Sequence, residues 1–302
     1  MNLKNYLIKS PQERLTIFLE SLSITNRTPE YYVNWNKVDR ETKKYELELN
    51  TLNYLIGKDD IYSEALRLFT KQPNLLKAIP SLIASRDRVL DILTIDNDDN
   101  MSFEQLDFKT IDTSRIDDYL KFIEQSGLLN FLQQHANRSL VDYVYGVETG
   151  LDSNARKNRS GTTMEGILER HVAKISQEQK LEWKSQATAQ FIKDKWGIKV
   201  PVDKSERRFD VAVYSREKHK VWLIETNYYG GGGSKLKAVA GEFTELSQFV
   251  VTSDDDVEFV WVTDGQGWKT AHLPLAEAFS HITNVFSLEM LREGFLSELF
   301  RQ

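Results

Sequence analysis

Two carboxylates in the second half of the chain stand where a cation could be bound. Asp210 interrupts the apolar alternation of residues 208–214, and Glu225 ends the apolar run 221–224. Burying a lone carboxylate is costly, so two acidic residues at matching strand ends indicate a metal ion. Bound there, Mg²⁺ would polarise a phosphoryl oxygen and lower the pKa of a bound water. The alternative is ion pairing of both carboxylates with the nearby basic residues Arg207, Arg208 and Lys220.

A third acidic residue precedes these strands. Apolar residues at helical spacing predict a helix over 163–175, and Glu165 lies at the border of its apolar stripe. Glu165 could therefore face the same metal site. Thr162 and Glu165 also fit a capping box, in which the glutamate accepts a hydrogen bond from a backbone N–H at the helix start. The two roles do not exclude each other.

Four consecutive glycines, Gly230–Gly233, follow the second of these strands and precede Ser234 and Lys235. Their order fits neither a P-loop nor a dinucleotide-binding fingerprint. What remains is a backbone that can approach a ligand closely. Ser234 and Lys235 then open a predicted helix, whose first N–H groups could hold an anion.

The charge of the chain is unevenly distributed. Residues 155–220 contain 16 Lys and Arg against 9 Asp and Glu, a local charge of +7. Because the whole chain carries −6, the rest carries −13. A basic segment in an acidic protein can mark contact with a phosphate backbone, or it can be a solvated, lysine-rich helix face.

The elements that must position these residues form a mixed α/β core. We expect a mainly helical N-terminal region over residues 1–145 and a core over 146–302. The N-terminal region includes an exposed acidic loop at 96–100. Further along, the pattern predicts a basic loop at 154–161, helices at 177–196, 235–250 and 275–300, and strands at 208–214, 221–224 and 258–263.

Composition excludes several classes of protein. Among the 302 residues there is no cysteine, which excludes disulfide scaffolds, thiolate zinc sites, Fe–S clusters and cysteine nucleophiles. No apolar run approaches the roughly 20 residues that span a bilayer, and the first residues do not resemble a signal peptide. The five histidines form no metal-binding spacing, and no G-x-S-x-G elbow occurs. We therefore expect a soluble, cytoplasmic protein with no membrane partner.

Three stretches together carry a family resemblance. They are N-A-R-K-N-R-S-G from Asn154, followed by Met164-Glu165; then Phe209-Asp210; then I-E-T-N-Y-Y from Ile224 and G-G-S-K-L from Gly232. In this order they resemble the DpnII/MboI-type restriction endonucleases. The similarity is sharpest over residues 150–237 and looser toward the C-terminus, and the N-terminal helices add little to it.

The resemblance implies a PD-(D/E)xK nuclease fold and Mg²⁺-dependent cleavage of double-stranded DNA. The implied site is the palindrome GATC, cut before the G to leave 5′-phosphate ends. Asp210 and Glu225 would be metal ligands, with the Thr226 carbonyl as a third and Glu165 as a supporting acid. A palindromic site implies a two-fold protein, so we expect a homodimer.

The chain departs from the wider nuclease motif at Asn227, where a lysine is usual. Lysine orients the attacking water and stabilises developing charge, and asparagine can contribute only a neutral donor. Lys235 could supply the missing ammonium group, with Lys237 as the competing candidate.

The resemblance also suggests DNA contacts. Basic side chains before the acidic helix could bind phosphates or read guanine edges, and residues after the glycines could add to them. The candidates are Arg156, Lys157, Arg159, Ser234 and Lys237.

Other functions stay open from the sequence. A nuclease of the same fold could cut another palindrome or a methylated site. A DNA-binding protein with a decayed metal site, for which Asn227 would be the symptom, would bind specifically without cutting. A helical interaction protein with no nucleic-acid role is disfavoured by the intact order of acidic residues.

Overall fold

The structure is a computed structural model that describes residues 1–95, 99–201 and 207–302, without the side chains of Lys157 and Asn158. The predicted acidic loop at 96–100 therefore lies largely outside the described residues. The chain divides into two compact units. The first combines Met1–Pro29 with Lys157–Gln302, and the second is Glu30–Arg156.

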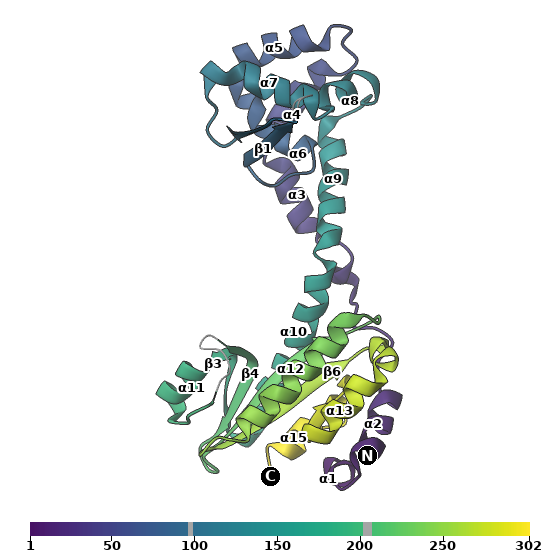
Figure 1. The fold of residues 1–302 in the computed structure, drawn as a ribbon, viewed down its shortest axis with the longest axis vertical. Helices are drawn as coiled ribbons and strands as arrows, with labels where there is room; N and C mark the ends of the chain where they lie inside the picture. Colours follow the sequence, from purple (N-terminus) through teal and green to yellow (C-terminus); the bar gives the residue numbers. More distant parts are fainter. Residues whose placement is uncertain (96–98, 202–206) are drawn as a thin grey trace. The chain divides into compact units, whose positions relative to one another are not determined.

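A mixed five-stranded sheet forms the centre of the first unit (Figure 1). Its order is β3-β4-β5-β6-β7, antiparallel between β3, β4 and β5 and parallel between β5, β6 and β7. The strands are β3 (Glu182–Thr188), β4 (Arg208–Ser215), β5 (Lys220–Tyr228), β6 (Asp256–Asp264) and β7 (Asn284–Phe286). The mixed α/β fold predicted from the sequence is confirmed.

Helices cover this sheet and complete its core. Helices α12 and α13 lie side by side against it (Figure 1), and the ring of Phe243 on α12 packs edge-on against Phe259 and Trp261 of β6. Helix α10 adds a buried apolar stripe to the same core. The helices of this unit are α1 (Leu3–Leu7), α2 (Pro11–Glu20), α10 (Arg156–Gln179), α11 (Ala189–Trp196), α12 (Ser234–Val250), α13 (His272–His281), α14 (Leu288–Arg292) and α15 (Phe295–Leu299), with η5 (Gln266–Thr270) before α13.

The first 29 residues belong to the sheet-containing unit, whereas the sequence suggested one N-terminal region over 1–145. Tyr6 is fully buried, and its hydroxyl donates to the Val285 carbonyl oxygen at 2.9 Å. Arg14 donates through Nη2 to the carbonyl oxygen of Phe279 at 3.2 Å. Long-range packing against β7 and α13 therefore determines where this segment belongs, and local periodicity does not reveal it.

The second unit is mainly helical and has its own hydrophobic core. It also contains a hairpin of β1 (Val89–Ile95) and β2 (Met101–Asp107), within a region predicted to be helical. Alternate residues of β1 are half-buried and exposed, which is the pattern of a strand on a core. The other elements are η1 (Pro29–Tyr31), α3 (Trp35–Lys43), α4 (Glu46–Leu52), η2 (Asn53–Leu55), α5 (Ile61–Lys71), η3 (Pro73–Ala78), α6 (Ile79–Leu82), η4 (Thr113–Arg115), α7 (Ile116–Gln125), α8 (Leu128–Gln134) and α9 (Leu140–Asn154).

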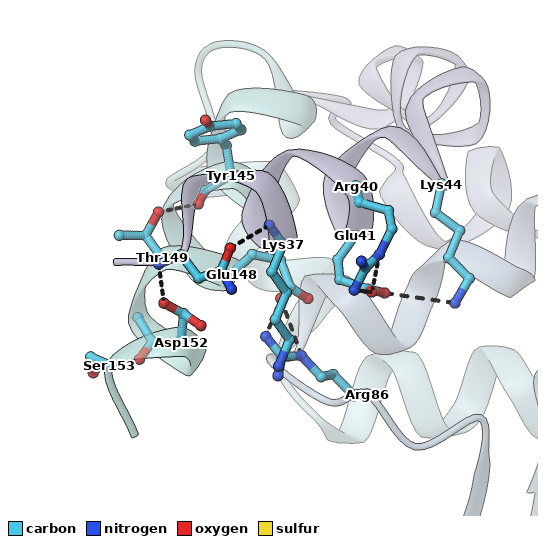
Figure 2. Close-up of polar contacts among 12 residues, drawn as sticks. Lys37, Arg40, Glu41, Lys44, Arg86, Tyr145, Glu148, Thr149, Asp152 and Ser153 are labelled. Carbon is cyan, nitrogen blue, oxygen red and sulfur yellow. Dashed lines mark hydrogen bonds and ion pairs between the residues drawn. The ribbon is translucent and has the colours of Figure 1, made fainter. Parts of the chain in front are cut away.

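Two buried carboxylates on α9 hold neighbouring segments of this second unit (Figure 2). Glu148 accepts two hydrogen bonds from the Arg86 guanidinium, the shorter at 2.5 Å. Asp152 Oδ2 accepts the backbone N–H of Asn34, which caps α3, at 2.8 Å. Paired and hydrogen-bonded carboxylates of this kind connect α9 with α3 and with the segment before β1.

Local predictions around the helix that carries Glu165 were wrong in three places. The basic stretch 154–161 is not a loop, because α9 runs to Asn154 and α10 begins at Arg156. Glu165 is therefore inside α10, so no capping box forms there. The predicted helix 177–196 is divided into the end of α10, strand β3 and helix α11. Lys180, with φ of 56°, separates α10 from β3, and pairing with β4 overrides the helical propensity of β3.

In the described part of the chain, no helix is both long and apolar enough to cross a membrane.

A close approach of two turns depends on Gly267. A Cβ added there would lie 2.3 Å from the Gly231 carbonyl oxygen and 2.7 Å from that of Tyr229. We expect Gly267→Ala to lower the free energy of unfolding by about 1–3 kcal/mol, because both contacts are with backbone. Gly241→Ala on the exposed side of α12, where a Cβ meets open space, should instead stabilise by about 0.5–1 kcal/mol. Urea denaturation of both variants would test this, and equal stabilities would contradict the tight turn.

Candidate active site

Asp210 and Glu225 are neighbours on adjacent antiparallel strands. The antiparallel register pairs Val211 with Ile224, so Asp210, which precedes Val211, lies opposite Glu225, which follows Ile224. They lie within hydrogen-bonding reach of each other. Asp210 Oδ2 also accepts the backbone N–H of Thr226 at 2.8 Å. The sheet thus brings together the two carboxylates predicted from the sequence.

Both carboxyl groups hold their protons more tightly than usual. Burial raises the pKa of Asp210, although the Thr226 N–H opposes the rise. Burial also raises the pKa of Glu225 well above its ordinary value, and the negative charge of Asp210 adds to that rise. Two carboxylates in such surroundings repel each other when both are ionised. A bound cation would relieve this repulsion.

One of the two carboxylates has a basic partner. Arg207 Nη1 lies 3.7 Å from Glu225 Oε1, and Arg207 Nη2 lies 2.9 Å from Glu242 Oε1 on α12. Lys220 pairs instead with Asp256 and Glu258. Across residues 1–95, 99–201 and 207–302, no Lys or Arg pairs with Asp210. Ion pairing with nearby basic residues therefore explains in part why a carboxylate stands at Glu225, but it does not explain the carboxylate at Asp210.

Gln186 connects the third acidic residue to this pair. On β3, its Nε2 donates to Asp210 Oδ1 at 3.4 Å and to Glu165 Oε2 at 3.5 Å, both long bonds. Its φ of 50° is unusual for a residue with a side chain, and such strain is concentrated at functional sites. The pKa of Glu165 is raised by burial and by the charges of Asp210 and Glu169.

The side chains that could hold a cation are the carboxylates of Asp210 and Glu225. Within the described residues, no three His, Asp or Glu side chains converge as a metal-binding group. Glu165 is thus placed beside the pair through Gln186 rather than as a member of a three-carboxylate cluster.

Asn227 lies two residues after Glu225 and so on the same face of β5. Its Oδ1 accepts a hydrogen bond from the Thr263 hydroxyl, its register partner on β6, at 2.5 Å. Thr263 Oγ1 in turn accepts the Trp268 indole N–H at 2.8 Å. Asn227, where a lysine is expected from the nuclease motif, is therefore held by a buried threonine beside it on β6, which is itself bonded to the buried Trp268.

The glycine segment ends where α12 begins, at Ser234, as the sequence predicts. Ser234, Lys235 and Lys237 are exposed on the first turn of this helix. None of the three has a hydrogen bond or ion pair with the acidic side chains of the described residues. The structure brings Asp210, Glu225 and Glu165 together and leaves these three at the surface.

The basic candidates lie close in sequence to the boundary between the two units, which falls between Arg156 and Lys157. Arg156 donates from Nε to the Tyr32 carbonyl oxygen at 3.1 Å, and its guanidinium lies 6.0 Å from the centre of the Tyr32 ring. Arg159 is half-buried on α10. The Lys157 side chain lies outside the described residues.

Sequence reasoning missed Gln186, Glu242 and Thr263 as parts of the site. Gln186 lies in a segment that reads as helical, Glu242 is one of many charges on α12, and Thr263 is one of several polar residues ending β6. Only strand pairing and helix packing place them beside the acidic pair. For Gln186, a signal was available in the short segment E-W-K-S-Q-A-T, which alternates weakly.

Comparison with known proteins decides the family. The family model described as DpnII restriction endonuclease matches residues 14–298. The chain belongs to the DpnII restriction endonuclease family. The match covers both structural units, including the N-terminal helices that carried little of the sequence resemblance.

Named members of this family are similar over nearly the full length. The type II restriction enzyme LlaDCHI of Lactococcus lactis subsp. cremoris is 74% identical over 302 residues, 100% of this chain and 99% of that protein. MboI of Moraxella bovis is 36% identical over 93% of this chain and 94% of that protein, and DpnII of Streptococcus pneumoniae is 32% identical over 89% and 92%. The resemblance is confirmed, and with it the prediction that this chain is a type II restriction endonuclease of the DpnII family.

Proposed function

We propose that the enzyme hydrolyses double-stranded DNA at GATC, before the G, in a Mg²⁺-dependent reaction on a PD-(D/E)xK core. The observation that carries the proposal is the Asp210–Glu225 pair, a half-buried and a buried carboxyl group, both with raised pKa, on adjacent strands. The DpnII-family membership supports GATC as the site. Hydrolysis would add a water oxygen to phosphorus and break the bond to O3′, leaving a 5′-phosphate.

Asp210 and Glu225 would hold the cation, with the Thr226 carbonyl as a further ligand. The fit rests on Asp210, which is half-buried and has no cationic partner among the described residues. When bound, Mg²⁺ would polarise a phosphoryl oxygen and lower the pKa of a bound water. The Thr226 N–H holds Asp210 Oδ2 in place, and Glu165 with Gln186 would orient Oδ1.

Asn227 would act on the same face as a neutral hydrogen-bond donor to the phosphate. For the positive charge that the motif lysine supplies elsewhere, we retain Lys235 as the candidate and Lys237 as its competitor. Ser234, Lys237, Arg156, Lys157 and Arg159 would contact DNA. A palindromic target suits a homodimer. The cytoplasm, where the DNA of the cell lies, is the compartment that we propose for the enzyme.

Digestion of unmethylated plasmid DNA, with Mg²⁺ or with EDTA, tests the proposal. Mapped ends at GATC that require Mg²⁺ are the expected result. Discrete fragments ending at another sequence would overturn GATC and keep the nuclease. A shifted DNA band without cleavage at any Mg²⁺ concentration would overturn the nuclease proposal in favour of a DNA-binding protein with a decayed metal site.

The role of Lys235 can be separated from that of Lys237. If Lys235 supplies charge to the phosphate, we expect Lys235→Ala to lower the single-turnover cleavage rate by about 10- to 100-fold. Lys237→Ala should then weaken DNA binding alone, and the equally exposed Lys269→Ala serves as a control. Undiminished cleavage by Lys235→Ala would remove Lys235 from the mechanism, and loss of rate in Lys237→Ala would assign the charge to Lys237.

A further inference from the structure

Three side chains form a chain of hydrogen bonds beside the acidic pair, ending at Asn227 on the same face of β5 as Glu225. The Trp268 indole N–H donates to Thr263 Oγ1 at 2.8 Å, and Thr263 Oγ1 donates to Asn227 Oδ1 at 2.5 Å. Trp268 and Thr263 are both fully buried. Asn227 is half-buried and ends the chain at the site.

The order of donors in this chain determines the orientation of the Asn227 amide. An indole N–H can only donate, so Thr263 Oγ1 must accept from Trp268. The Thr263 hydroxyl hydrogen then needs an acceptor, because a buried donor without one is costly. Asn227 Oδ1 is the acceptor available to it among the described residues. A reversed amide would present Nδ2 to Thr263 and leave the hydroxyl hydrogen unpaired.

The consequence is a donor aimed away from β6. With Oδ1 held by Thr263, Asn227 Nδ2 points to the other side of the amide, on the face of β5 that carries Glu225. In the part of the chain that the structure describes, Nδ2 has no hydrogen-bond partner. Two N–H groups therefore remain for a ligand at this face.

Trp268 is itself rigidly placed. Its ring packs edge-on against Trp261 and Tyr229, with centroid distances of 5.3 and 5.4 Å. Trp261 is the register partner of Glu225, and the Gly267 N–H donates to the Tyr229 carbonyl oxygen at 2.8 Å. The tryptophan thus links the turn before α13 to β6 and to the residue that follows β5.

We propose that Thr263 and Trp268 are positioning residues that hold the Asn227 amide with its NH₂ group toward the scissile phosphate. This inference rests on the proposed function and assigns a means by which a neutral asparagine acts at the position of a lysine. A freely rotating amide would present its oxygen to the phosphate part of the time, and two oxygens repel. A fixed amide presents only donors.

We call the hydrogen-bonded chain from Trp268 through Thr263 to Asn227 the relay. Variants of Thr263 test whether the hydroxyl of this residue, rather than its volume, is what holds the Asn227 amide. Thr263→Val keeps the shape and removes the hydroxyl, so we expect single-turnover cleavage to fall about 10- to 100-fold, with DNA affinity in Ca²⁺ unchanged. Thr263→Ser restores the hydroxyl and should cleave within about threefold of the wild type. Trp268→Phe removes the first donor and should fall between them. Thr244→Val, which loses a hydroxyl bonded to the Ala240 carbonyl of α12, is the matched control.

The double variant separates positioning from general damage. In an Asn227→Ala background, Thr263→Val should cause no further loss of rate, because the group that it positions is already gone. An equal loss in both backgrounds, or full activity of Thr263→Val alone, would overturn the relay.

NMR spectroscopy tests the relay independently of DNA cleavage. The side-chain NH₂ signals of Asn227, identified by their absence in Asn227→Ala, should stay in place in Thr263→Ser and shift or broaden in Thr263→Val. The same signals unchanged in Thr263→Val would overturn the relay. Absence of cleavage by the wild type would overturn the proposed function alone.

Discussion

Asp210→Asn is expected to abolish Mg²⁺-dependent cleavage, with a loss of at least about 1,000-fold in single-turnover rate. The substitution keeps the size of the side chain and its hydrogen bond with the Thr226 N–H. It removes the one charge of the pair that has no basic partner in the described residues. Cleavage of a GATC duplex under enzyme excess would measure the effect.

DNA binding distinguishes loss of chemistry from loss of fold. We expect Asp210→Asn to shift the same duplex in Ca²⁺ with an affinity close to that of the wild type. Asp254→Asn, which removes an exposed carboxylate from the turn before β6, should cleave normally. Full cleavage by Asp210→Asn would contradict the assignment of the metal site.

Glu225→Gln is expected to stabilise the metal-free protein while it abolishes cleavage. Glu225 is buried beside Asp210, and its pKa is raised well above the ordinary value of 4.5. The folded state therefore holds this proton to a higher pH than the unfolded state. As pH rises from about 4.5 through the raised pKa, the free energy of unfolding falls, and above that pKa the full destabilisation is present.

Glutamine has no proton to lose, so this contribution to the pH dependence should vanish. Arg207 keeps an acidic partner in the variant, because it also pairs with Glu242 at 2.9 Å. At pH 8 in EDTA we expect a higher Tm for Glu225→Gln than for the wild type. Each kcal/mol corresponds to about 2–4 °C in a unit of this size.

Scanning calorimetry between pH 5 and pH 8 would measure the difference. The gap in Tm should widen as pH rises, and Mg²⁺ should raise the Tm of the wild type more than that of the variant. Glu289→Gln, which removes a carboxylate from the surface ion pair with Arg292 on α14, is the control for general charge effects. If the wild type is more stable than Glu225→Gln at pH 8 in EDTA, the claim that ionised Glu225 beside Asp210 destabilises the metal-free protein is wrong.

The residues that carry the chemistry could be found in the sequence because their signals are local. Asp210 interrupts an alternating strand and Glu225 ends an apolar run, and both patterns lie within eight residues. Strands β4, β5 and β6 and helix α12 were predicted for the same reason. Periodicity within one element reports which side of it is buried.

Tertiary structure alone decided what surrounds those residues. Gln186 reaches Asp210 because β3 pairs with β4, and Thr263 reaches Asn227 because β5 and β6 are in parallel register. The segment of Gln186 has the composition of a helix end and becomes a strand only through that pairing.

The boundaries of the helices, strands and units likewise depend partly on local sequence and partly on tertiary contacts. Sequence alone predicted the acidic pair, the glycine segment, the mixed α/β core and the family. It misplaced residues 1–29, which pack against β7 and α13, and the start of α10, which continues almost directly from α9. The predicted helix 275–300 was also wrong, because strand β7 divides this segment into α13 before it and the short helices α14 and α15 after it. Contacts between residues far apart in the chain decide these features, because the free energy of burial depends on which surfaces meet and not on the order of residues within one segment.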